Sequence, residues 1–180
     1  MKRIMRYDRI AVCGTHGVGK TGLVGLLAAE SGHPIVPDGA REIRKLARMD
    51  WWTINASHLA RFQAEVFIRH MTAISGRTRF IADRSILDIM ACTTYQSQRS
   101  LENSSFLQLL RLQLELSARR LSRMHDRLVF YSPAGTELTE EKSGVNSLIL
   151  DFLAKYAGEW DTVTRLQVYD HFGDRVLGAE

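Results

Sequence analysis

The sequence has little cysteine: two of its 180 residues, Cys13 and Cys92, are cysteines. They form no Cys-x-x-Cys pair, and no metal-ligand spacing surrounds either of them. This scarcity argues against a disulfide framework and is typical of a protein in a reducing compartment. We therefore expect a cytoplasmic location.

Long apolar runs are absent as well. The basic N-terminal stretch, residues 1–10, is not followed by the apolar segment of a secretory signal. No run approaches the roughly 18 apolar residues that a membrane span needs. We therefore expect no membrane partner.

The composition is that of an ordinary globular chain, with 45% hydrophobic and 24% charged residues. A chain of 180 residues is a suitable length for one domain with a real core, so we expect a single domain over residues 1–180. The net charge of +4 suits polyanionic ligands such as nucleotides or nucleic acid, but it is also common in proteins that bind neither.

Short apolar runs of β type alternate with longer helical patterns, which predicts a parallel α/β sheet. We expect strands at residues 9–13, 35–36, 79–83, 128–132 and 162–168. We expect helices at residues 20–30, 40–48, 57–74, 86–95, 106–124 and 146–157, with polar loops at 96–105 and 133–145. Within 106–124 the leucines alternate as in a half-buried strand, but the strong helix formers around them favour a helix.

A glycine-rich stretch follows the first predicted strand. Residues 14–21, GTHGVGKT, match the phosphate-loop pattern G-x-x-x-x-G-K-[ST] at every fixed position. Backbone N–H groups of such a loop bind phosphate oxygens at the start of a helix. We predict that ATP is bound by Gly14, Thr15, His16, Gly17, Val18, Gly19, Lys20 and Thr21. Lys20 is expected to reach the terminal phosphates, and the Thr21 hydroxyl to coordinate Mg²⁺.

Charged residues follow the third predicted strand, at Asp83-Arg84-Ser85. The carboxyl ends of parallel strands line the ligand crevice of such sheets. Asp83 could hold Mg²⁺ through water, and Arg84 could bind a phosphoryl group during transfer. The alternative is a cap for the following helix, and the two roles are compatible.

An acidic residue, Asp38, follows the second predicted strand. From this edge its carboxylate could act as general base toward an acceptor hydroxyl. A cap for the helix that begins near Ala40 is an equally good interpretation.

The third predicted helix carries an aromatic residue and an amide side by side, Phe62 and Gln63. A glutamine amide can bond the edge of a base, and an aromatic ring can stack on it. By themselves, however, these residues favour a solvated Gln63 and a core Phe62.

Together these motifs resemble the P-loop nucleoside and nucleotide kinases, which are AAA-type NTPases. The resemblance is to deoxyribonucleoside kinases and to the nicotinamide riboside kinase-like group in particular, and it extends over residues 9–95. It implies a three-layer fold around a five-stranded parallel sheet in the order 2-3-1-4-5. In those families an acidic residue ending strand two is the base, the position of Asp38, and a Glu-Arg-Ser follows strand three, the position of Asp83, Arg84 and Ser85.

The resemblance also suggests how the acceptor is bound. Phe62 and Gln63 match a Phe-Gln pair whose glutamine contacts the base, and the Arg41-Glu42 that follows Asp38 is similar to the nicotinamide riboside kinase-like pattern. The implied acceptor-binding residues are Asp38, Arg41, Phe62, Gln63, Asp83 and Arg84. The implied catalytic residues are Asp38, Lys20 and Arg84, and the implied Mg²⁺ ligands are Thr21 and Asp83.

We therefore expect an ATP-dependent kinase that transfers the γ-phosphoryl group to a hydroxyl or monophosphate of a nucleoside-like acceptor. One alternative is a kinase of nucleic acid, such as one that phosphorylates a hydroxymethylated pyrimidine base within DNA. A GTP switch is less favoured because the chain has no N-K-x-D guanine signature. A DNA-stimulated ATPase is also less favoured.

Other segments leave their roles open. A short lid is possible at about 133–145, where Lys142 is the one basic residue. Arg119, Arg120 and Arg123 are either a solvated face or phosphate ligands. Trp51, Trp52 and His58 are either core residues or part of an aromatic pocket for a base.

Overall fold

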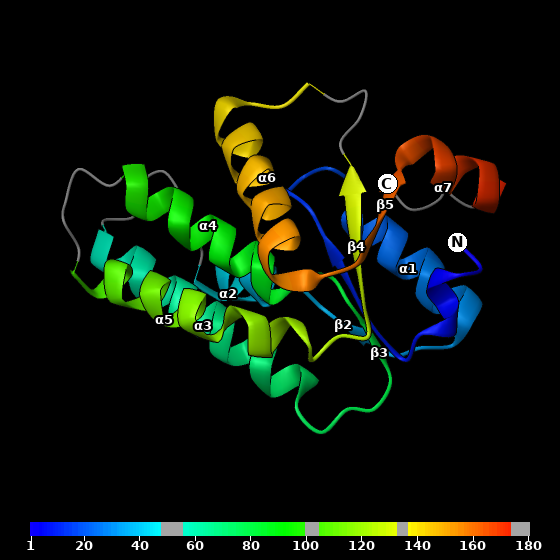
Figure 1. Ribbon diagram of the computed structural model, residues 1–180, viewed down its shortest axis with the longest axis horizontal. Helices are drawn as coiled ribbons and strands as arrows, with labels where there is room; N and C mark the ends of the chain where they lie inside the picture. The colour runs from blue at the N-terminus through cyan, green and yellow to red at the C-terminus, as the bar shows by residue number, and fades with distance from the viewer. Residues whose placement is uncertain (48–55, 100–104, 133–136, 174–180) are drawn as a thin grey trace.

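The computed structural model describes residues 1–47, 56–99, 105–132 and 137–173. Its centre is a five-stranded sheet in the order β2-β3-β1-β4-β5, with every pair parallel (Figure 1). The strands are β1 Arg9–Cys13, β2 Ile35–Val36, β3 Phe80–Ala82, β4 Arg127–Ser132 and β5 Trp160–Thr164. The predicted fold class and strand order are therefore confirmed.

Helices cover both faces of the sheet. They are α1 Lys20–Ser31, α2 Gly39–Ala47, α3 Ala56–Ile74, α4 Ile86–Arg99, α5 Ser105–Ser122, α6 Glu140–Phe152 and α7 Arg165–Phe172, with a 3₁₀ turn η1 Ile4–Arg6 and a π-helical turn η3 Leu153–Ala157. Two apolar clusters hold these layers: one joins the sheet to α1, α7 and η1, and the other joins it to α2 through α6 (Figure 1). β1 lies between β3 and β4, and its residues Ile10 to Cys13 are completely buried.

The strand expected at 162–168 is wrong in its position. β5 ends at Thr164, and residues 165–172 form α7 instead. Thr164 begins that helix with a capping box, in which its side chain accepts from Gln167 N and the Gln167 side chain accepts from Thr164 N. The apolar residues Leu166 and Val168 suggested a strand, but the cap pattern outweighs this short apolar spacing.

The polar loop expected at 133–145 is also wrong in part. α6 begins at Glu140, because Thr139 caps it by accepting from Lys142 N and two acidic residues occupy its first turn. The loop expected at 96–105 is helical up to Arg99, the end of α4. The helix chosen for 106–124 is confirmed as α5, despite its alternating leucines.

Some expectations fall on residues outside the described part of the chain. These are the roles of Trp51 and Trp52, the end of the second helix at Arg48, and the part of the possible lid at 133–136. Within the described ranges, the structure contains no helix long and apolar enough to cross a membrane.

Two histidines are buried between α3 and the start of β4. The rings of His70 and His125 are stacked with centroids 6.0 Å apart, and the edge of His125 meets Phe80. Burial lowers the pKa of His70 to about 4. The charge of Asp88 opposes this shift, and the charge of Arg84 adds to it. Burial, His70 and Arg9 lower the pKa of His125 to about 3. Both rings are therefore neutral near pH 7.

We expect this pair to make the protein sensitive to acid. Below an unfolded-state histidine pKa of about 6.5, the unfolded chain binds protons that the folded chain does not. The free energy of unfolding therefore decreases as the pH is lowered. Each histidine should contribute a slope of about 1.4 kcal/mol per pH unit down to about pH 4. Urea unfolding between pH 7 and pH 4 measures this slope.

The double variant His70→Phe/His125→Phe should remove that part of the slope. Leu166→Gln, at an exposed leucine of α7, supplies a control, since it changes no titratable group and should leave the slope of the wild type unchanged. Equal slopes for the double variant and the wild type would show that the buried pair is not the cause.

Candidate active site

The phosphate-loop residues adopt a conformation that requires glycine. Gly19, which precedes α1, has φ 98°, in the left-handed region. Gly14 has φ 144°, and a Cβ there would lie 2.9 Å from the carbonyl oxygen of Tyr131 in β4. The loop therefore curls tightly between β1 and α1, with its backbone close to β4.

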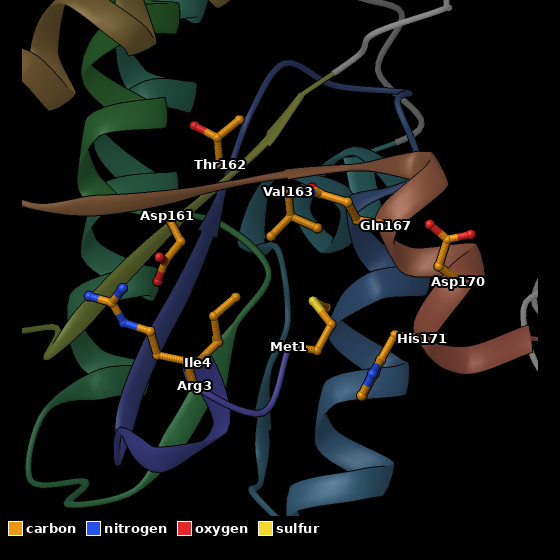
Figure 2. A pocket seen from close by; sticks show the side chains of 9 residues that line it. All are labelled: Met1, Arg3, Ile4, Asp161, Thr162, Val163, Gln167, Asp170 and His171. Atoms are coloured by element: carbon orange, nitrogen blue, oxygen red, sulfur yellow. The ribbon is translucent and has the colours of Figure 1, made fainter.

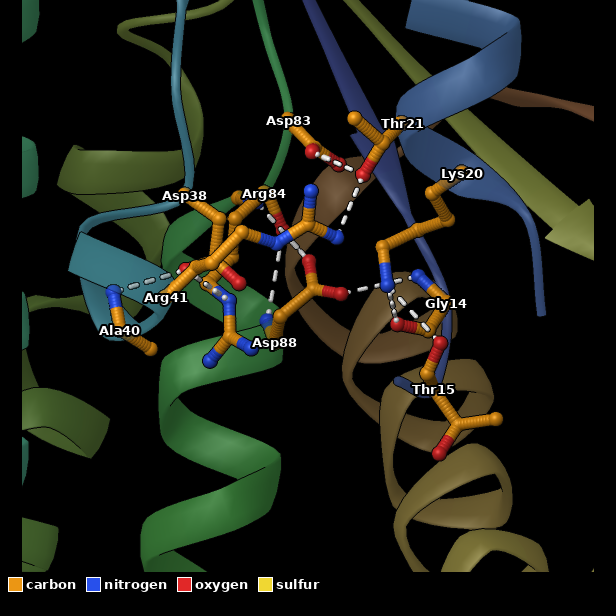
Figure 3. Close-up of polar contacts among 11 residues, drawn as sticks. Gly14, Thr15, Lys20, Thr21, Asp38, Ala40, Arg41, Asp83, Arg84 and Asp88 are labelled. Atoms are coloured by element: carbon orange, nitrogen blue, oxygen red, sulfur yellow. Dashed lines mark hydrogen bonds and ion pairs between the residues drawn. The ribbon is translucent and has the colours of Figure 1, made fainter. Parts of the chain in front are cut away.

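The Lys20 side chain lies inside this loop. Its ammonium group donates to the carbonyl oxygens of Gly14 at 2.6 Å and Thr15 at 2.8 Å (Figure 3). The residue is 8% exposed, so its charge is held within the curve of the loop. The Thr15 hydroxyl oxygen is also buried and has no hydrogen-bond partner among the described residues. A buried cation and an unpaired hydroxyl in one loop fit a polar, anionic ligand.

The Thr21 hydroxyl joins three elements. It donates to Asp83 Oδ2 at 2.6 Å and accepts from Arg41 Nη2 at 3.0 Å (Figure 3). Burial raises the pKa of Asp83, although the Thr21 hydrogen bond and Lys20 oppose the shift. A hydroxyl and a carboxylate at this distance fit a Mg²⁺ that keeps water and phosphate oxygens as its other ligands.

No fuller metal cage is found. In the part of the chain that the structure describes, no group of three or more His, Cys, Asp or Glu side chains is placed to hold a metal.

The Asp38 carboxylate pairs with Arg84. Arg84 Nε lies 3.1 Å from Asp38 Oδ1, and their side chains are 10% and 18% exposed. The same oxygen accepts from Ala40 N at 3.0 Å, so Asp38 also caps the start of α2 (Figure 3). Burial opposes the charge of Arg84, but Asp38 above all raises its pKa, and the net shift is upward. The capping interpretation of Asp38 is therefore confirmed, and the carboxylate still faces a cation.

One buried carboxylate at the site was not predicted. Asp88 Oδ1 accepts from Gly14 N at 2.8 Å, while Asp88 Oδ2 accepts from the N–H and hydroxyl of Ser85 at 2.9 and 2.6 Å. The Ser85 hydroxyl in turn accepts from Leu87 N at 3.1 Å, which makes it the cap of α4. Asp88 thus connects the phosphate loop to the segment that carries Asp83 and Arg84. The spacing Ser85-x-x-Asp88 is a capping-box signature and could have indicated it.

A cavity of about 500 Å³ brings these side chains together. Its lining includes His16, Gly17, Gly19, Lys20, Thr21, Asp38, Arg41 and Asp83. Of the predicted acceptor-binding residues, Asp38, Arg41 and Asp83 therefore meet Lys20 and Thr21 in one space, at the carboxyl ends of β1, β2 and β3. Arg84 is not among the lining residues and reaches this space through its ion pair with Asp38.

The start of α6 places a cation beside the phosphate loop. A Cβ at Gly17 would lie 3.2 Å from Lys142 Nζ, so the Lys142 ammonium group lies next to Gly17, which lines the cavity, although Lys142 is not itself a lining residue. Partial burial and nearby cations, Lys142 first among them, lower the pKa of His16 to about 4. α6 packs into the core through Val145, Ile149 and Phe152, and an exposed ion pair of 2.6 Å joins Arg99 to Glu140 in its first turn.

The aromatic–amide pair on α3 lies elsewhere. Phe62 is 4% exposed and belongs to the apolar core, and neither it nor Gln63 is among the residues that line the cavity. Gln63 is 1% exposed, so the interpretation of it as a solvated residue is wrong. Its Nε2 donates to Gln96 Oε1 at 2.9 Å, while its Oε1 has no partner among the described residues.

The arginine cluster of α5 is distant from the phosphate loop along the sheet. Arg119, Arg120 and Arg123 are exposed and precede the first residue of β4, whereas the loop follows the last residue of β1. In a parallel sheet the amino ends and the carboxyl ends of the strands lie on opposite sides. The arginines therefore form a solvated face and do not bind phosphate at the phosphate loop.

A second hollow, of about 410 Å³, lies between the N-terminus, β5 and α7 (Figure 2). It shares no residue with the cavity at the phosphate loop. Two of its polar side chains already have partners: Asp161 accepts from Arg127 at 2.6 Å, and His171 lies 3.4 Å from Glu30. The cavity at the phosphate loop is therefore the candidate active site.

Comparison with known proteins supports this choice. A family model described as an AAA domain matches residues 9–143, which include every element that lines the cavity. No curated protein matches the chain at a significant level of sequence similarity.

Solved structures with the same fold include several kinases. Deoxyadenosine kinase from M. mycoides with bound dCTP has a TM-score of 0.61 and 11% identity, over 86% of this chain and 88% of that chain. NadR in complex with NR has a TM-score of 0.65 and 18% identity, over 98% of this chain and 52% of that chain, so this chain spans about half of NadR. Thymidylate kinase from Candida albicans has a TM-score of 0.56 and 15% identity, over 95% and 91%. The fold implied by the sequence resemblance is thus confirmed.

We expect Asp88→Asn to disturb the loop and lower stability. An amide has one acceptor oxygen, so it cannot satisfy both Gly14 N–H and the Ser85 donors, and a buried donor loses its partner. The free energy of unfolding should fall by about 1–3 kcal/mol, measured by chemical denaturation.

The exposed Asp151 supplies the matched control on α6. Asp151→Asn should change the free energy of unfolding by no more than about 0.5 kcal/mol. An Asp88 variant as stable as this control would show that the carboxylate does not hold the loop.

Proposed function

We propose that this chain, which belongs to the AAA domain family, is an ATP-dependent kinase that phosphorylates a hydroxyl of a nucleoside-like acceptor. One observation carries the proposal: Asp38, the candidate base, lines the same cavity as Lys20 and Thr21 of the phosphate loop. A base and a triphosphate site in one cavity suit transfer to an acceptor better than simple nucleotide binding.

The donor half rests on the cations around the cavity. The loop N–H groups and Lys20 would bind the phosphates, and Arg84 would stabilise the charge on the transferring group. Lys20 is preorganised by the carbonyls of Gly14 and Thr15, so little rearrangement is needed when phosphate replaces them. Mg²⁺ held by Thr21 and Asp83 would neutralise charge on the phosphate oxygens.

The acceptor half rests on Asp38. Its carboxylate would accept the proton of the acceptor hydroxyl as the hydroxyl oxygen forms its bond to the γ-phosphorus. The bond between that phosphorus and the bridging oxygen breaks, and ADP leaves with the electron pair. The ion pair with Arg84, at 3.1 Å, orients Asp38 before the acceptor arrives.

The acceptor class rests on fold relatives. They include a deoxyadenosine kinase, a thymidylate kinase and a NadR protein bound to NR. A nucleoside or a nucleoside monophosphate is therefore the acceptor we propose. Arg41, which lines the cavity, would bind a polar group of this acceptor. Gln63 faces Gln96 rather than the cavity lining, so a contact with the base would require its amide to change partners.

A phosphoryl-transfer screen tests the proposal. Labelled ATP and Mg²⁺ are offered with nucleosides, nucleoside monophosphates, nicotinamide riboside and DNA with ordinary or hydroxymethylated bases. Transfer to a small acceptor is the expected result. Transfer to DNA alone, with binding that weakens steeply as salt rises, would establish the nucleic-acid alternative instead. Transfer to none of these acceptors, with equal affinity for GTP and ATP, would favour a nucleotide switch.

We expect Asp38→Asn to lower kcat by about 10²–10⁴, because an amide cannot accept the hydroxyl proton. ATP affinity, measured by calorimetry, should change far less, since the phosphate loop is intact. The exposed Asp151 again supplies the control, and Asp151→Asn should retain full turnover. Unchanged turnover in the Asp38 variant would exclude this carboxylate as the base.

We also expect Lys142→Gln to weaken ATP binding. The Lys142 ammonium group contacts the loop at Gly17, where it can reach a phosphate oxygen, and one charge-assisted hydrogen bond corresponds to about a tenfold change in Kd. The control is Lys2→Gln, at an exposed lysine that does not line the cavity, and it should leave Kd unchanged. Equal Kd values for both variants would remove Lys142 from the site.

A further inference from the structure

The end of the Arg41 side chain lies at the candidate metal ligands. Arg41 Nη2 donates to Thr21 Oγ1 at 3.0 Å, and the Thr21 hydroxyl donates to Asp83 Oδ2 at 2.6 Å (Figure 3). Of the lysine and arginine side chains that line the cavity, Lys20 binds carbonyl oxygens of the loop, whereas Arg41 binds this hydroxyl. A guanidinium therefore lies on the oxygen that a Mg²⁺ bound to Thr21 would need.

The Thr21 hydroxyl oxygen cannot serve both cations. A threonine hydroxyl has one hydrogen to donate and two lone pairs that accept. Asp83 takes the hydrogen, and Arg41 takes one lone pair. A divalent cation on the second lone pair would lie beside the guanidinium charge, and two cations at such short range repel each other strongly in a partly buried site. Mg²⁺ also demands a near-ideal octahedral shell, which leaves little room for a guanidinium at one of its ligands.

We propose that Arg41 competes with Mg²⁺ for the Thr21 hydroxyl oxygen and has to leave it before the metal binds. This rests on the proposed function, in which Thr21 and Asp83 hold the Mg²⁺ that accompanies the nucleotide. Arg41 is an exposed residue in the first turn of α2, so its side chain is able to turn away from the cavity without disturbing the core. Arg41 is then a gate at the metal site.

The contact between Arg41 and Thr21 has a physical reason. Asp83 is 5% exposed, and a buried carboxylate is costly unless a cation or hydrogen-bond donors compensate its charge. Through Thr21, Arg41 brings a positive charge to this carboxylate, as a bound metal would. The same contact therefore stabilises the Thr21–Asp83 pair and lowers the affinity of that pair for Mg²⁺.

Calorimetry with ADP tests the gate without any turnover. The Kd of ADP is measured on the full chain with excess Mg²⁺ and again with EDTA, and the ratio of the EDTA value to the Mg²⁺ value gives the contribution of the metal. In Arg41→Gln this ratio should be about tenfold larger than in the wild type, because the metal no longer displaces a charge-assisted hydrogen bond. Arg41 is exposed, so the variant should keep its fold, which circular dichroism checks.

Two further variants separate local competition from a general effect of charge. Arg41→Lys keeps a positive charge at the same position and should stay close to the wild-type ratio. Arg44→Gln removes an equal charge one turn further along α2, at an exposed residue that does not line the cavity, and it should also leave the ratio unchanged.

The ratios decide between the gate and other roles of Arg41. Equal ratios in the wild type and Arg41→Gln would overturn the gate. If ADP binding were also weakened equally with Mg²⁺ and with EDTA, Arg41 would be a ligand of the nucleotide instead. A ratio for Arg44→Gln or Arg41→Lys as large as that of Arg41→Gln would overturn the gate as well. The proposed function fails by a different result, a wild type that binds ADP under neither condition, and that result would overturn the gate with it.

Discussion

The hydrogen bonds of one buried carboxylate connect the two halves of the candidate site. Asp88 binds the N–H of Gly14, while the carbonyl of Gly14 binds the Lys20 ammonium group. Its other oxygen binds Ser85, which follows directly after Asp83 and Arg84. A shift of α4 would therefore move the phosphate loop and the Asp38–Arg84 pair together. Asp88 therefore connects the backbone of the phosphate loop directly to the backbone that follows Asp83 and Arg84.

The site also balances charge before any ligand binds. Lys20 binds two carbonyls, Arg84 binds Asp38, and the Thr21 hydroxyl lies between Arg41 and Asp83. Each of these groups keeps a partner that a phosphate or metal can replace, so no charge is buried without compensation. This explains how the fold tolerates several ionised side chains in one partly buried cavity.

The sequence predicts the parts of this structure that local rules decide. The phosphate loop, β1, β2 and α5 follow from glycine spacing, apolar runs and helix formers, and the sheet order follows from a family resemblance. β5 was misplaced, and its predicted range took in the first residues of α7, because a side-chain cap at Thr164 ends a strand that hydrophobicity alone would continue. Asp88 and Gln63 were missed or misjudged because their roles depend on partners far along the chain, Gly14 and Gln96.

α5 shows why one pattern in a sequence can point to two structures. Alternation of leucine and polar residues is the pattern of a strand with one buried face. In a helix, the same spacing distributes leucines around the circumference. The core covers the side of Leu107 and Leu114, whereas Leu109, Leu112 and Leu116 on the other side are exposed. The pattern is ambiguous because leucines on two faces of one helix can follow each other at the two-residue spacing that is also typical of a strand.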